Sequence, residues 1–127
     1  MLANHVTLLR TLSRLYQAGE YAGVVIIARS TLDALTTHAS QRLALPATTN
    51  LNQRIDGLAT ANALPPAAKR LAHTLRIRGN KAVHESLPEF NTRTHALEAI
   101  RMLVDILLAL RPYLEKGDVA LDSGEAA

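Results

Sequence analysis

The segment 76–84 carries the side chains best suited to chemistry, in the order Arg-Ile-Arg-Gly-Asn-Lys-Ala-Val-His. Arginine can neutralise the charge of a phosphoryl group, and an imidazole can take up or release a proton near neutral pH. With about 100° of rotation per helical residue, Asn80 and His84 lie on one face, whereas Arg78 lies about 120° away from His84. A long guanidinium, a bulge at Gly79 or a partner subunit could close that gap. If the chain performs chemistry, this segment must therefore supply the side chains for it.

Positive charge is concentrated around this segment. No acidic residue occurs between Asp56 and Glu85, whereas five basic residues do: Lys69, Arg70, Arg76, Arg78 and Lys81. Such a surface attracts phosphate groups over long range, although a run of charge is also typical of a solvated helix face. Charge alone therefore does not name a ligand.

Several other chemistries are excluded by what the chain lacks. It has no cysteine, so disulfides, thiolate nucleophiles and cysteine-bound metals are excluded. The glycines form no dinucleotide-binding or phosphate-binding loop, no two histidines are spaced by four, and no serine lies in a nucleophile elbow. We therefore expect no metal and no cofactor. No apolar run reaches the roughly 18 residues that cross a bilayer, so we expect a cytoplasmic protein that does not enter the membrane.

Helices are expected to position these side chains. Leucine and alanine dominate a composition with only 3% aromatic residues, which favours an all-α fold, an up-and-down bundle of about five helices. Apolar spacing, caps and prolines predict five helices. The first four cover 4–18, about 20–44, a short segment after Asn50, and about 65–85. The fifth is capped by Asn91 or Thr92 and runs on to 116. We expect one domain over 1–116 and a flexible tail over 117–127.

Two of these helices have faces that bear on function. The fourth is expected to pack on its neighbours through an arc opposite the polar stripe, formed by Ala68, Leu71, Ala72, Leu75, Gly79, Ala82 and Val83. The fifth has a wide apolar arc that includes Leu103, Ile106 and Leu110. Either this arc is wholly internal, or part of it meets another subunit.

The segment 76–84 resembles the signature of HEPN domains (higher eukaryotes and prokaryotes nucleotide-binding), in which an arginine precedes a histidine by four to six intervening residues. Arg78 and His84 enclose five. Together with segment 28–35, it is similar to a HEPN-related bacterial family of unknown function that is often attached to type I restriction-enzyme motor subunits. The resemblance covers about residues 15–112. One departure is Gly79, which follows the arginine where many active members carry a polar residue.

The resemblance implies a homodimeric helical bundle that cleaves RNA without a metal ion. In-line transfer at phosphorus places the attacking 2′-hydroxyl and the leaving 5′-oxygen on opposite sides, which suits two facing imidazoles. The implied catalytic roles are proton exchange by His84 of each protomer, charge stabilisation by Arg78, and orientation of the histidine or the substrate by Asn80. The residues implied to bind RNA phosphates are Lys69, Arg70, His73, Arg76 and Lys81.

Other functions remain open. The protein could be a non-catalytic nucleic-acid-binding, protein-interaction or dimerisation module of a restriction or defence system, in which Asn80 and His84 bond backbone carbonyls and Arg78 pairs with Asp33 or Glu85. It could also be a toxin-like ribonuclease held in check by an antitoxin protein. Arg29 and Asp33, four residues apart, are either an ion pair within the second helix or a support behind the motif.

Overall fold

The computed structural model describes residues 2–85 and 88–114, and this part of the chain contains helices and no strand. The five α-helices are α1 (Leu2–Gln17), α2 (Tyr21–Arg42), α3 (Leu51–Thr60), α4 (Pro66–Glu85) and α5 (Arg93–Leu110). Two short 3-10 helices follow α4 and α5, namely η1 (Pro88–Phe90) and η2 (Arg111–Tyr113). The prediction of an all-α bundle of about five helices is therefore confirmed.

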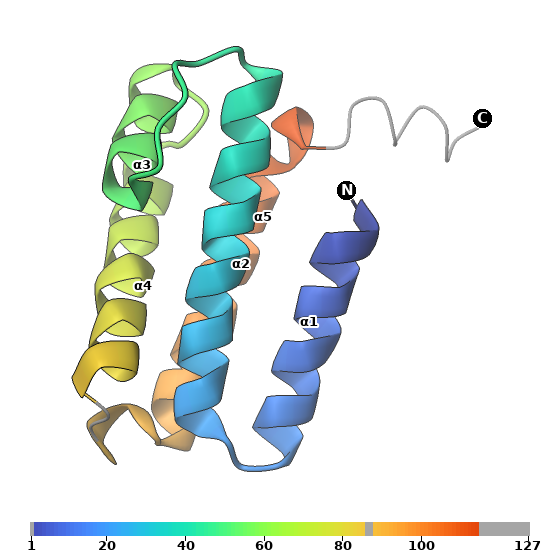
Figure 1. Cartoon of the computed structure of the whole chain (residues 1–127), viewed down its shortest axis with the longest axis vertical. Helices are drawn as coiled ribbons and strands as arrows, with labels where there is room; N and C mark the ends of the chain where they lie inside the picture. Colours follow the sequence, from blue (N-terminus) through green and yellow to red (C-terminus); the bar gives the residue numbers. More distant parts are fainter. Residues whose placement is uncertain (1, 86–87, 115–127) are drawn as a thin grey trace.

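The bundle is built around α2, which packs against each of the other four α-helices. Figure 1 shows α1 beside α2 on one side and α3 and α4 on the other, with α5 behind. The four long helices alternate in direction along the chain, as expected of an up-and-down bundle. Because α3 is short, it lies beside only the N-terminal half of α4.

The core lies between the four long helices and α3. Its largest fully buried side chains include Leu32 and Leu35 of α2, Ile55 of α3, and Leu75 of α4. The arc of α5 that could have met another subunit is internal, because Leu103, Ile106 and Leu110 are each at most 1% exposed. Different residues form the exposed apolar stripe of α5: Leu97, Val104 and Leu108.

The helix ends follow local rules. The Asn50 side chain accepts a hydrogen bond from the backbone N–H of Gln53 at 3.2 Å, which confirms the predicted cap of α3. The Thr92 side chain accepts one from the backbone N–H of His95 at 3.1 Å, which confirms one of the two candidate caps of α5. The other candidate, Asn91, caps a different helix, because its Oδ1 accepts from the N–H of Ala22 at 3.1 Å.

One predicted helix end is wrong. The fifth helix was expected to run on to 116, but α5 ends at Leu110 and the chain continues as η2. Pro112 explains the change, because it has no N–H for the helical ladder and its ring clashes with the carbonyl four residues earlier. The predicted tail, 117–127, lies outside the described residues. None of the described helices combines the length and the apolar character that a bilayer crossing needs.

Candidate functional site

Helix α4 presents the predicted chemistry on a face that α3 leaves open. Its core-facing arc is close to the expectation, since Ala68, Ala72, Leu75, Gly79 and Ala82 are buried and Leu71 is half-buried. Val83 is the correction, because it is 49% exposed. It lies at the edge of the arc, in the half of α4 that α3 does not reach.

Four residues form the open surface, which we call the His84 face: Ile77, Asn80, Val83 and His84. His84 is exposed, and Asn80, one helical turn earlier, is half-buried. Ile77 and Val83 lie on either side of these polar groups and expose 44% and 49% of their surface. The His84 face therefore combines an imidazole and an amide with apolar surface that a second molecule could cover.

Arg78 does not join this face within one protomer. Its Nη1 donates to Oε1 of Glu98 on α5 at 2.8 Å, and its side chain is 32% exposed. The chain is α-helical throughout Pro66–Glu85, so the bulge at Gly79 that could have turned Arg78 toward His84 does not form. The alternative pairing of Arg78 with Asp33 is also wrong, since α5 supplies a carboxylate on the side of α4 to which Arg78 points.

The N-terminal half of the basic stripe is partly neutralised by α3. Asp56 Oδ1 accepts a hydrogen bond from Nε2 of His73 at 2.8 Å and lies 3.8 Å from Nζ of Lys69. Nε of Arg76 donates to Nδ1 of His73 at 3.2 Å, so the imidazole carries its proton on Nε2. These contacts join three predicted phosphate-binding residues in one network. The other two, Arg70 and Lys81, are exposed.

Gly79 has a packing role that its place in the motif did not reveal. A Cβ at this position would lie 2.5 Å from Cβ and 2.7 Å from Cδ of Arg29, so only glycine lets the Arg29 side chain cross α4 here. The Nε of Arg29 is buried and has no hydrogen-bond partner among the described residues. Arg29 therefore does support the motif segment by direct contact.

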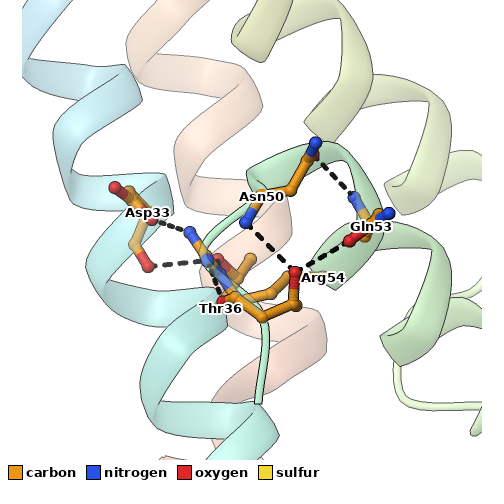
Figure 2. A network of polar contacts seen from close by, with 6 residues as sticks. Asp33, Thr36, Asn50, Gln53 and Arg54 are labelled. Carbon is orange, nitrogen blue, oxygen red and sulfur yellow. Dashed lines mark hydrogen bonds and ion pairs between the residues drawn. The ribbon is translucent and has the colours of Figure 1, made fainter. Parts of the chain in front are cut away.

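The predicted ion pair between Arg29 and Asp33 is wrong, because Asp33 Oδ1 instead binds Nη2 of Arg54 on α3. Figure 2 shows this network: the Arg54 guanidinium also donates to Thr36 Oγ1 at 3.3 Å and to the backbone carbonyl of Thr48 at 2.7 Å. Burial lowers the pKa of Arg54, and the nearby charge of Arg29 lowers that pKa further. The side chain of Arg54 is only 7% exposed, so three acceptors compensate a nearly buried charge.

Sequence reasoning missed Arg54, although a signal was present. Leu51, Arg54, Ile55 and Leu58 follow the three- and four-residue spacing of a buried helical face, and an arginine on such a face requires partners.

Two hollows in the described part of the chain lie near α3 rather than at the His84 face. One, of about 300 Å³, is lined by the 45–48 loop together with Ser40, Gln53, Arg54 and Gly57. Another, of about 550 Å³, lies at the α3–α4 connection and includes Lys69. Neither hollow includes Arg78, Asn80 or His84. Among the side chains that the structure describes, no three histidine or acidic groups gather as metal ligands would.

Comparison with known proteins adds one finding. A family model described as a domain of unknown function (DUF4145) matches residues 10–118, which include the second half of α1 and all of α2 to α5. No curated protein and no solved structure gives a significant match.

Proposed function

This chain belongs to the DUF4145 family, and we propose that it is a homodimeric, metal-independent endoribonuclease of a cytoplasmic defence or toxin–antitoxin type system. The observation that carries the proposal is the His84 face, where an exposed imidazole and Asn80 lie between the exposed apolar side chains of Ile77 and Val83. Two such faces can pack through their apolar residues and bring two imidazoles into one cleft.

The chemistry of RNA cleavage explains why two copies are needed. One His84 imidazole accepts the proton of the 2′-hydroxyl as its oxygen attacks phosphorus, and the His84 of the partner subunit donates a proton to the leaving 5′-oxygen. The products are a 2′,3′-cyclic phosphate and a 5′-hydroxyl. Asn80 orients the imidazole or the substrate from one turn away. A single imidazole cannot easily stand on both sides of the phosphorus, so one protomer alone is insufficient.

Arg78 stabilises the negative charge of the phosphoryl oxygens in this proposal. It must then exchange Glu98 for the phosphate, or act on the site of the partner subunit. Its side chain is one-third exposed, so the exchange does not require the bundle to open.

The test is cleavage of a mixed-sequence single-stranded RNA by the purified chain in the presence of EDTA. We expect 2′,3′-cyclic phosphate ends with the wild type and a loss of at least about a hundredfold in rate for His84→Ala and Arg78→Ala. Arg42→Ala, an exposed arginine at the end of α2, is the control and should cleave normally. Melting temperatures near that of the wild type would exclude misfolding as the cause of the loss.

A second function is favoured by the contacts of the motif residues themselves. Arg78 joins α4 to α5 through Glu98, and Gly79 joins α4 to α2 through Arg29, so both residues also hold the bundle together. The alternative is therefore a non-catalytic nucleic-acid-binding or dimerisation module of a restriction or defence system, with a restriction or antitoxin protein as partner. A well-folded wild-type dimer that cleaves no RNA would favour this function.

A further inference from the structure

Arg29 is held in an unusual place for an arginine. The carbon atoms of its side chain pass across Gly79, where the missing Cβ leaves room for them between α2 and α4. Its Nε is buried without an acceptor among the described residues. A buried N–H group that lacks a partner destabilises a fold, because it loses its hydrogen bonds to water and gains none in return. The fold therefore retains a group that packing alone does not explain.

The charges around Arg29 do not compensate it. Asp33, one turn later on α2, binds Arg54, and no ion pair joins it to Arg29. The Arg54 guanidinium is close enough for its pKa to be lowered by the charge of Arg29. Two arginines thus share the surroundings of one carboxylate, and that carboxylate serves Arg54. An anion beside Arg29 would supply both the missing acceptor and the missing charge.

We propose that Arg29, held across Gly79, binds a phosphate group of single-stranded RNA that lies along the His84 face. The inference rests on the proposed function for its ligand, and it locates a phosphate contact outside the motif segment. Arginine suits this role because its planar guanidinium can donate two parallel hydrogen bonds to phosphate oxygens. Asn80 directly follows Gly79 and lies about 100° around α4 from it, so an RNA strand that contacts Arg29 reaches the His84 face by continuing around this turn of α4.

The first measurement follows the Nε–H signal of Arg29 in NMR spectra of the ¹⁵N-labelled full chain, assigned from its loss in Arg29→Lys. Inorganic phosphate and a short single-stranded RNA are added in separate titrations. We expect both ligands to shift the Arg29 signal more than that of Arg42, with the RNA effective at lower concentration. A shift with inorganic phosphate alone would overturn RNA as the ligand, and no shift with either would overturn the site.

The second measurement is the affinity for a fluorescein-labelled mixed-sequence RNA as a function of salt. Arg29→Met keeps an unbranched side chain on Gly79 and removes the charge, and we expect it to bind about tenfold more weakly. The slope of log affinity against log salt should fall by about 0.7, as for the loss of one contact to a single strand. Arg42→Met on the same helix should bind as the wild type does. If Arg29→Met folds poorly, Arg29→Lys should still weaken binding, because it keeps the charge and loses the paired hydrogen bonds.

These results separate the inference from the nuclease proposal. If the wild type does not cleave RNA but binds it in a manner that depends on Arg29, the phosphate contact is supported and the nuclease proposal is overturned. If the wild type cleaves RNA and both folded Arg29 variants bind RNA with unchanged affinity, the nuclease proposal is supported and the phosphate contact is overturned.

Discussion

Arg54 carries its charge into the bundle because acceptors from α2 and from the loop before α3 surround its guanidinium. Replacing it by methionine leaves the carboxylate of Asp33 without its partner and removes a polar contact between α3 and α2. Because Asp33 is 46% exposed, water can replace part of the lost interaction. We expect Arg54→Met to lower the free energy of unfolding by about 2 kcal/mol, measured by urea denaturation. Arg42→Met should change it by less than about 0.5 kcal/mol, and an equal effect of both variants would contradict the structural role of Arg54.

Glu98 distinguishes two roles of Arg78, phosphate binding and contact between helices, because it pairs with this arginine. Glu98→Gln removes the negative charge beside Arg78 and keeps a side chain of the same shape. If Arg78 binds phosphate, RNA affinity should rise by about threefold, since releasing a partly exposed ion pair is worth less than about 1 kcal/mol. The control is Glu89→Gln, an exposed carboxylate on η1 with the same change of net charge. Equal RNA affinities of the two variants would favour the structural role of Arg78.

The sequence predicts on which face of α4 each polar residue lies more reliably than it predicts the partners of these residues. The turn angles placed Asn80 and His84 on one face and Arg78 away from it, and the structure agrees. The partners are on other helices: Asp56 for His73, Glu98 for Arg78, and Arg54 for Asp33. Spacing along one helix cannot reveal these pairs, because they depend on how the helices are arranged around α2.

Gly79 and Gly57 both lie within helices, and replacing each by alanine tests how closely each helix packs on its neighbours. Alanine in place of glycine favours a helix by about 1 kcal/mol. At Gly57 nothing lies within 4 Å of the added Cβ, so Gly57→Ala should stabilise the protein by up to that amount. At Gly79 the added Cβ would overlap the Cβ of Arg29, which is fixed to the backbone of α2.

The two helices must therefore separate, and such overpacking destabilises proteins by about 1 to 3 kcal/mol. The gain in helix propensity offsets part of this loss, so we expect Gly79→Ala to lower the free energy of unfolding by about 1 kcal/mol in total. Thermal and urea unfolding of both variants would measure the difference. Equal stabilisation by the two substitutions would show that α2 and α4 are not in close contact at this glycine.

The limits of the helices were predictable where a local signal sets them. Asn50 and Thr92 cap the following helices, and Pro66 stands in the first turn of α4. The exception was the end of α5, where the apolar pattern continues through Leu114, which is itself buried, although Pro112 has already interrupted the α-helix. Burial therefore extends past the end of α5, and for this reason the periodicity suggested a longer helix.

For the whole molecule, composition was enough to predict an all-α bundle, but it could not divide the apolar surface between the core and a partner. The wide arc of α5 is buried in its own bundle, so the positions left exposed are now known. Apart from Val6 and Leu9 on α1, these positions form two separate surfaces. One is the His84 face with Ile77 and Val83, and the other is the stripe of Leu97, Val104 and Leu108 on α5.

The composite site requires that a second copy bind at the first of these surfaces. Val83→Lys should convert the dimer to a monomer in sedimentation velocity and abolish RNA cleavage. Its melting temperature as a monomer should change little, because Val83 is 49% exposed there. Leu108→Lys is the matched control, since Leu108 is 59% exposed and lies about 80° around α5 from Glu98. If Leu108→Lys separates the dimer and Val83→Lys leaves it intact, the dimer forms through α5 and holds the two His84 side chains apart. Proton exchange between facing imidazoles would then be excluded.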